Sequence, residues 1–113
     1  MENVAYHTYK SCIDACLACA SVCHHCAASC LQEEDVKMMA RCIQLDMECA
    51  ALCYAAAQLM SLGSSQAMMI CSLCADACAA CAAECSKHEH KHCQECAELC
   101  RRCAEECRNM KPA

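Results

Sequence analysis

The sequence contains no phenylalanine and no tryptophan, and it has a single glycine and a single proline. Strands are usually rich in aromatic and β-branched residues, whereas glycine and proline mark the turns between short elements. Their scarcity argues against a protein built from many short strands. Alanine, leucine, methionine and glutamate are abundant and favour helices instead. We therefore expect an all-α fold.

The sequence also lacks an excess of positive charge. Its formal net charge is −5 at neutral pH, and its nine lysine and arginine residues are scattered along the chain. A nucleic-acid partner would require a basic surface that neutralises phosphates. We therefore expect no nucleic-acid partner.

Signals for export or membrane insertion are missing as well. The first residues show no basic segment followed by an apolar run, and no uninterrupted apolar stretch approaches the ~18 residues that span a bilayer. We expect no membrane partner and a cytoplasmic location, where thiols are kept reduced. The odd number of cysteines, 19, agrees with this expectation because complete pairing within one chain is impossible.

Cysteine is the residue that the sequence has in excess, with 19 among 113 residues. Successive cysteines within a row are three, four or seven positions apart, which places each row on one face of a helix. A helical bundle normally carries leucine and isoleucine at these positions. The four rows are Cys12, Cys16, Cys19, Cys23, Cys26 and Cys30; Cys42, Cys49 and Cys53; Cys71, Cys74, Cys78, Cys81 and Cys85; and Cys93, Cys96, Cys100, Cys103 and Cys107.

The rows predict four helices within one domain, 1–113, at residues 4–31, 36–62, 65–86 and 91–109. We expect Asp35 to cap the second helix, Gly63 to follow its last turn, and Ser64 or Ser65 to cap the third. Because the connections are short, neighbouring helices must run antiparallel. The predicted fold is an all-α, antiparallel up-down-up-down four-helix bundle with a cysteine-lined core.

Other residues complete the inward-facing rows or lie beside them. Continuing the heptad pattern adds nine positions, which are Tyr9, Met39, Asp46, Ala56, Met60, Ala67, His88, Glu89 and Met110. Alanine recurs next to the rows, where it would let helices approach closely, at Ala20, Ala27, Ala50, Ala57, Ala75, Ala82, Ala97 and Ala104. Side chains smaller than leucine would leave a cavity along the axis, which is costly unless something occupies it.

Three ordinary explanations for so many cysteines fit the pattern poorly. One or two buried cysteines act as small hydrophobic residues, but a whole core of them would be underpacked. Disulfides between neighbours on one helix face would distort the backbone. Iron–sulfur clusters use four ligands around a compact loop, whereas these rows extend along roughly 30 Å of helix at ~1.5 Å per residue. A tube that binds soft metal ions is the remaining interpretation.

Thiolates select mainly Cu(I) or Zn(II) among such ions. Zinc prefers four thiolates per ion, so full occupancy would leave a strongly negative lumen, which is costly in a low-dielectric core. One Cu(I) per thiolate cancels the charge completely. Low-coordinate Cu(I) also accepts two or three sulfurs from one or two helices. Charge and geometry both favour copper.

The four helices, the repeated C-x-x-x-C-x-x-C rows and the histidines and methionines near the helix ends resemble the copper storage protein family over essentially the whole chain. In the absence of an export signal, the chain is similar to the cytosolic branch of that family. The resemblance implies a homotetramer that stores or buffers many Cu(I) ions per subunit. It also implies that all nineteen cysteines are candidate ligands.

The ends of the tube and one carboxylate supply candidate accessory residues. Cys30, Met39, Cys85, His88, Glu89, His90 and Cys93 should gather at one end, which we predict to be the mouth. Tyr9, Met60, Ala67, Met68, Cys107 and Met110 should plug the other end. His88, His90, Met39 and Asp46 are the candidates for accessory metal contacts or copper uptake. His7, His24, His25 and His92 lie off the rows and are expected to face solvent or neighbouring side chains.

The predicted function is storage and sequestration of many Cu(I) ions by the core thiolates. No open site with a positioned acid and base is visible, so we predict that the chain is not an enzyme. A copper chaperone, a zinc or other heavy-metal thiolate buffer, and a redox sink are the alternatives.

Overall fold

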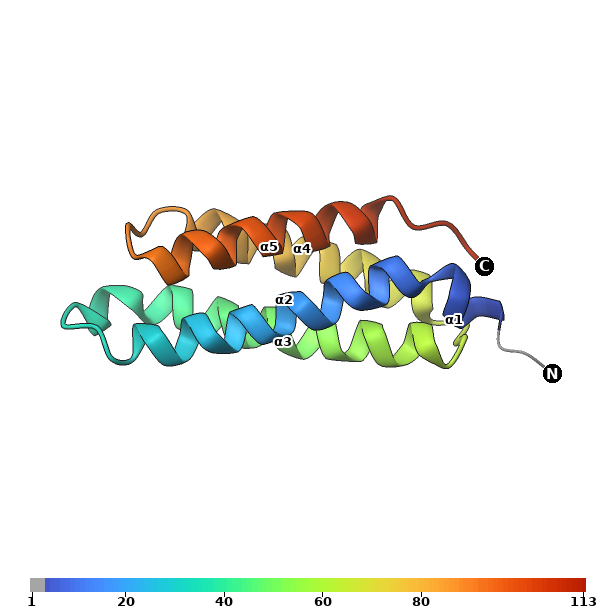
Figure 1. The fold of residues 1–113 in the computed structure, drawn as a ribbon, viewed down its shortest axis with the longest axis horizontal. Coiled ribbons are helices and arrows are strands. Elements are labelled where there is room, and N and C mark those ends of the chain that lie inside the picture. Colours follow the sequence, from blue (N-terminus) through green and yellow to red (C-terminus); the bar gives the residue numbers. More distant parts are fainter. Residues whose placement is uncertain (1–3) are drawn as a thin grey trace.

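The computed structural model describes residues 4–113 and confirms the all-α fold (Figure 1). Its helices are α1 (Val4–Thr8), α2 (Lys10–Cys30), α3 (Ala40–Ser61), α4 (Ala67–Cys85) and α5 (Lys91–Arg108), with the short 3-10 helix η1 (Val36–Met39) before α3.

The four long helices form an antiparallel bundle with the shape of a rod. Helix α2 packs against α3 and α5, and α4 packs against the same two helices. The rod measures 53 × 19 × 18 Å. Helix α1 and the C-terminus lie at one end, the terminal end, and the loops at 31–39 and 86–90 lie together at the other, the distal end (Figure 1).

The helix expected at residues 4–31 is interrupted at Tyr9. The backbone there adopts φ −93° and ψ 2°, which separates α1 from α2. The Tyr9 side chain is buried among the core residues, and its hydroxyl accepts a hydrogen bond from the backbone N–H of Ala113 at 2.9 Å. The interruption therefore coincides with a side chain that helps to close the terminal end.

The expected side-chain cap from Asp35 is missing, whereas Ser64 makes a capping hydrogen bond just before α4. No side-chain hydrogen bond from Asp35 caps the next element, and η1 separates Asp35 from α3. The residue preceding α4 is Gln66, whose backbone N–H donates to the Ser64 hydroxyl at 3.0 Å. Tertiary contacts explain the missing cap, because the Asp35 carboxylate faces His90 across the distal end.

Gly63 ends α3 as predicted. Its φ is 66°, in the left-handed region that glycine adopts without a steric penalty. The N–H groups of Gly63 and Ser64 donate to the carbonyls of Met60 and Leu59 at 3.1 and 3.0 Å. These two hydrogen bonds form a Schellman motif, which satisfies the free carbonyls of the last turn. The chain can then reverse sharply into α4.

The contacts between adjacent helices lie around the cysteine rows. The recurrent alanines beside the rows are at most 5% exposed, as expected of residues at close helix contacts. Ile13 and Leu45 are also buried beside the rows, while Met39 and Met60 are buried near the two ends. Hydrocarbon therefore surrounds the row of thiols and closes it at both ends.

Helices α2 and α4 are long and apolar enough to cross a membrane by length and composition alone. Much of this apolar character comes from cysteine and alanine, and all the cysteines and about half of the alanines of these helices face the bundle interior. Core helices of bundles that never contact lipid pass the same test. The property is therefore weak support for a membrane span.

Candidate metal centre

All nineteen cysteines lie in the interior of the bundle and carry free thiols. None of them is more than 4% exposed, and most are fully buried. Their sulfur atoms contact one another at 3.2 to 4.0 Å, with Cys42 and Cys85 the closest pair. The cavity expected from small side chains is therefore closed, because sulfurs from different helices meet across the axis.

The thiols form a continuous series of four-sulfur groups along the bundle. In each group the sulfur atoms all lie within 4.8 Å of one another. The middle groups share members. Cys53 contacts Cys103 at 3.9 Å toward one end, and Cys85 contacts both Cys81 and Cys42 at 3.8 and 3.2 Å toward the other, so the series has no wide gap. Five of these groups are Cys16, Cys74, Cys103 and Cys107; Cys19, Cys49, Cys53 and Cys78; Cys19, Cys23, Cys49 and Cys100; Cys23, Cys81, Cys96 and Cys100; and Cys26, Cys30, Cys42 and Cys93.

Every long helix contributes to this series. Cys19 of α2 lies 3.6 Å from Cys100 of α5, and Cys53 of α3 lies 3.6 Å from Cys74 of α4. Such contacts connect helices that are far apart in the sequence. A metal ion in any group would therefore be held by several helices at once.

Two thiols at the distal end, those of Cys30 and Cys93, are poorly suited to ionise without a metal. Burial is the main cause that raises the pKa of Cys93 to about 11, and it also raises the pKa of Cys30 above its ordinary value. A buried charge is costly in a low-dielectric interior. These thiols therefore keep their protons at neutral pH until a cation replaces them.

Asp46 is the buried carboxylate of the lumen and is fully enclosed. The thiols of Cys81 and Cys96 each donate to its Oδ1 at 3.2 Å, and Cys85 donates to the same oxygen at 3.5 Å. Burial, followed by the nearby Cys96 and Cys42 sulfurs, raises the pKa of Asp46 to about 8. The side chain is thus a hydrogen-bond acceptor for thiols, one of the two roles expected for it.

The histidine that approaches the thiols is His92, which was expected to lie away from them. Its Nδ1 is 3.6 Å from the sulfurs of Cys26 and Cys93 and 3.8 Å from that of Cys30. The side chain is only 13% exposed. His92 therefore closes the distal end of the thiol series.

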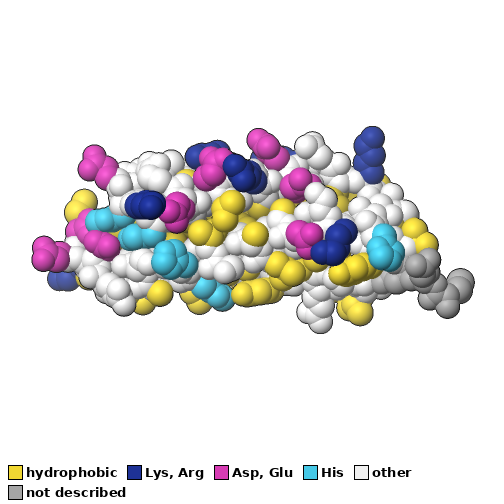
Figure 2. All heavy atoms as spheres, in the orientation of Figure 1, with side chains coloured by type: hydrophobic (Ala, Val, Ile, Leu, Met, Phe, Trp, Pro, Cys, Tyr) yellow, Lys and Arg dark blue, Asp and Glu magenta, His cyan; other side chains and the backbone are white. Residues whose placement is uncertain are grey.

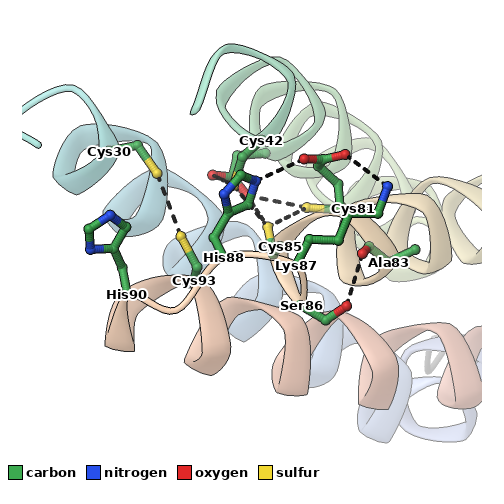
Figure 3. Close-up of polar contacts among 12 residues, drawn as sticks. Cys30, Cys42, Cys81, Ala83, Cys85, Ser86, Lys87, His88, His90 and Cys93 are labelled. Atoms are coloured by element: carbon green, nitrogen blue, oxygen red, sulfur yellow. Dashed lines mark hydrogen bonds and ion pairs between the residues drawn. The ribbon is translucent and has the colours of Figure 1, made fainter. Parts of the chain in front are cut away.

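The two histidines chosen from the sequence contact carboxylates instead of thiols in the described contacts. His88 Nε2 lies 2.8 Å from the Glu84 carboxylate, a contact drawn as a dashed line from His88 in Figure 3. His90 lies between Glu33 and Asp35. Glu89, placed on the inward row by the heptad pattern, is exposed. The heptad pattern fails at these positions because α4 ends at Cys85 and the following residues form a loop.

His92 has one sequence signal that could have identified it. It immediately precedes Cys93 in the first turn of α5, and it lies four positions before Cys96. A residue in the first turn of a helix can reach over the open end of a bundle, where no preceding turn covers the core. The heptad pattern alone assigns this position to the flank.

Met39 is 1% exposed and lies at the distal end, consistent with its expected position on the inward rows. At the terminal end, Tyr9, Met60 and Ala67 are buried as expected of a plug. Even so, Cys12 is 3% exposed there, beside a hollow of about 290 Å³, and Cys107 is 4% exposed, beside a second hollow of about 270 Å³. The sulfurs at the terminal end are therefore slightly more accessible than those behind His92.

The raised pKa of Asp46 predicts a pH-dependent stability of the metal-free protein. The folded carboxyl keeps its proton up to about pH 8, whereas in the unfolded chain it ionises near 3.8. Because the folded state binds about one more proton between these values, stability should fall as pH rises, by about 1.4 kcal/mol per pH unit. Asp46→Asn should flatten this slope between pH 5 and pH 7.5, measured by urea unfolding of reduced protein under anaerobic conditions. Equal slopes in both proteins would show that Asp46 is already ionised.

Comparisons with known proteins agree with this geometry. Residues 5–112 match the sequence model of the copper storage protein family. The uncharacterized cysteine-rich protein YhjQ of Bacillus subtilis (strain 168) is 48% identical over 85 residues, covering 75% of this chain and 79% of that protein.

Solved structures of copper storage proteins share the fold. The Cu(I)-bound copper storage protein BsCsp3 has a TM-score of 0.89 and 46% identity, covering 94% of this chain and 99% of its own. A cytosolic copper storage protein from Streptomyces lividans, loaded with five coppers, has a TM-score of 0.88 and 38% identity, covering 95% and 94%. The family match over residues 5–112 and these similarities show that the chain belongs to the copper storage protein family.

Proposed function

We propose that this chain stores many Cu(I) ions on the thiolates of its core. One observation carries the proposal: nineteen buried, reduced cysteines form a continuous series of sulfur groups along the bundle axis. A site for one or two ions would need only a few of them. The series provides capacity, and its burial keeps bound copper away from other molecules.

The chemistry of the lumen suits Cu(I). Each Cu(I) that replaces a thiol proton leaves the lumen neutral, so loading adds no buried charge. Soft thiolates prefer soft Cu(I), and the sulfur contacts between helices offer pairs and triplets of ligands. Because protons are released, acidic pH should weaken copper binding. The nineteen cysteines are the proposed ligands, with Asp46 as an accessory contact.

The solved relatives support this assignment. BsCsp3 is described as Cu(I)-bound, and the Streptomyces lividans protein has been solved with five coppers and with ten copper equivalents. Since this chain shares the fold of these proteins and lines its own core with cysteines, we propose that it also holds several ions per chain.

A zinc or other heavy-metal buffer is the second candidate, favoured by the four-sulfur groups themselves. Zn–S bonds of ~2.3 Å imply sulfur separations of about 3.8 Å in a tetrahedron, close to the separations of Cys19 and Cys49 and of Cys53 and Cys78, which are 3.8 Å. Zinc would leave surplus negative charge if all thiols ionised, so we favour copper. A chaperone would instead expose a C-x-x-C pair, and the described cysteines are all buried.

We further propose a non-enzymatic role in the cytoplasm, as part of a homo-oligomer, for which a tetramer is the expectation from the family. The outer surface offers apolar side chains for such an interface. Leu17, Leu31, Met47, Tyr54 and Leu73 are between 44% and 63% exposed.

Copper uptake is proposed to occur at the distal end. Histidines gather there with acidic side chains (Figure 2). His92 connects this surface to the thiols of Cys26, Cys30 and Cys93. An imidazole in contact with three thiols can hold Cu(I) briefly before thiolates take it. His92 replaces His88 and His90 as the proposed uptake contact.

The storage proposal predicts high copper capacity in a preformed bundle. Fully reduced, metal-free protein should show its full helix content by circular dichroism before any metal is added. Anaerobic titration against a competing Cu(I) chelator should then show tight uptake approaching one Cu(I) per cysteine. Saturation at one or two ions would contradict storage and favour a chaperone, and tighter uptake of Zn(II) than of Cu(I) would favour the zinc buffer.

Removing thiols from the middle of the series should lower capacity without unfolding the bundle. We expect the quadruple variant Cys19→Ser, Cys49→Ser, Cys78→Ser and Cys100→Ser to lose several Cu(I) ions, because these residues belong to two adjoining groups. A matched control converts four exposed alanines to serine, at Ala28, Ala51, Ala80 and Ala83. Unchanged capacity in the cysteine variant would contradict the lumen as the storage site.

Uptake through the distal end predicts a kinetic defect without a loss of capacity. His92→Asn should slow the transfer of Cu(I) from a weak chelator several-fold, because Nδ1 no longer reaches the three thiols. Stopped-flow absorbance in the thiolate-to-copper charge-transfer band measures the rate. Met110→Leu, at the terminal end, serves as the comparison. Slowing by Met110→Leu but not by His92→Asn would place the route of uptake at the terminal end.

A further inference from the structure

Glu33, His90 and His92 form a cluster on the outside of the distal end. One carboxylate oxygen of Glu33 lies 3.3 Å from His92 Nε2, and the other lies 3.3 Å from His90 Nδ1. The two imidazole rings are stacked with their planes 7° apart. Glu33 comes from the loop after α2, His90 from the loop after α4 and His92 from the first turn of α5, so two nitrogens and one carboxylate come together there.

The separations in this cluster lie at the long end for hydrogen bonds, and they also match the edges of a metal site. N–H···O hydrogen bonds usually measure 2.7–3.2 Å. Zinc bonds to nitrogen and oxygen of about 2.05 Å place tetrahedral ligands about 3.3 Å apart. Both nitrogen–oxygen separations in the cluster equal that value.

In each histidine, the ring nitrogen that does not face Glu33 already has a partner. His90 Nε2 lies 3.2 Å from the Asp35 carboxylate, and His92 Nδ1 faces the thiols of Cys26 and Cys93. Metal-binding histidines generally have such a partner on the second nitrogen, which fixes the tautomer and the ring orientation. With this partner in place, the nitrogen that faces Glu33, which is Nδ1 of His90 and Nε2 of His92, is available as a metal ligand.

We propose that Glu33, His90 and His92 bind one divalent cation of intermediate softness, such as Zn(II), at a site separate from the thiol lumen. Imidazole and carboxylate ligands favour such an ion, whereas Cu(I) prefers the neighbouring thiolates. The three ligands leave a fourth position for water. The ion would join the loop at 31–39 to the start of α5 and cover the distal end.

The site also has a consequence for copper, which rests on the proposed storage function. A divalent ion on His92 Nε2 leaves Nδ1 protonated, so Nδ1–H donates to a thiolate and is not free to bind Cu(I). Occupancy of the outer site should therefore slow copper passage through the distal end. The binding site itself does not depend on that function.

Co(II) is a suitable probe because thiolate ligands give it intense charge-transfer bands and nitrogen and oxygen ligands give only weak d–d bands. Anaerobic titration of the Cu(I)-loaded protein should show one Co(II) per chain without thiolate bands. Glu33→Gln and His90→Asn should each weaken binding more than about tenfold. Glu34→Gln and His25→Asn are matched controls at exposed positions and should bind Co(II) as the unaltered protein does.

Three results would overturn the site. They are no Co(II) uptake by the loaded protein, uptake with thiolate bands only, and equal weakening by Glu33→Gln and Glu34→Gln, which would indicate general attraction to acidic charge. If Cu(I) loading itself fails, the storage proposal fails separately. The site is then tested on the metal-free protein, where Glu33→Gln should remove the d–d bands and leave any thiolate bands. Zn(II) that binds but leaves the rate of Cu(I) removal by a chelator unchanged would refute the effect on copper.

Discussion

The structure depends on holding many thiols in contact with one another inside a water-free bundle. A thiol contributes less buried hydrocarbon than leucine, so the core rows alone are a weak source of hydrophobic stabilisation. Alanines beside the rows compensate by bringing the helices close together, and Ile13 and Leu45 add hydrocarbon at the flanks. This close approach lets sulfurs from different helices meet at 3.2 to 4.0 Å. The same packing that closes the core therefore creates the groups of potential ligands.

The core must also remain electrically neutral, because its thiols are buried away from water. Thiols can be buried because their protonated form carries no charge, and the elevated pKa of Cys93 and that of Asp46 follow from the same burial. A monovalent soft cation can replace a proton without changing the charge of the lumen. Asp46 fits this environment because three thiols donate hydrogen bonds to one of its oxygens. The described residues contain no buried side-chain nitrogen or oxygen without a hydrogen-bond partner.

The distal end has a different chemistry from the lumen. Histidines and carboxylates replace thiols there, and His92 belongs to both regions because its two nitrogens face opposite ways. The residues at the distal end belong to the loops at 31–39 and 86–90 and to the first turn of α5. The terminal end is instead closed by Tyr9, Met60 and Ala67, together with the contact between Tyr9 and Ala113. The two ends therefore differ in polarity, although the thiol series extends between them.

The sequence by itself determined the four-helix fold, the inward direction of the cysteine rows and the turn at Gly63, because heptad spacing and glycine geometry are local properties. It also indicated the family, since the cysteine spacing extends over nearly the whole chain. Only the tertiary structure decided which histidine meets the thiols. His88 and Glu89 follow the end of α4 and leave the helical pattern, Asp35 pairs with His90 instead of capping a helix, and His92 turns inward at the start of α5. These positions depend on how two loops meet across the bundle end, which helical periodicity does not encode.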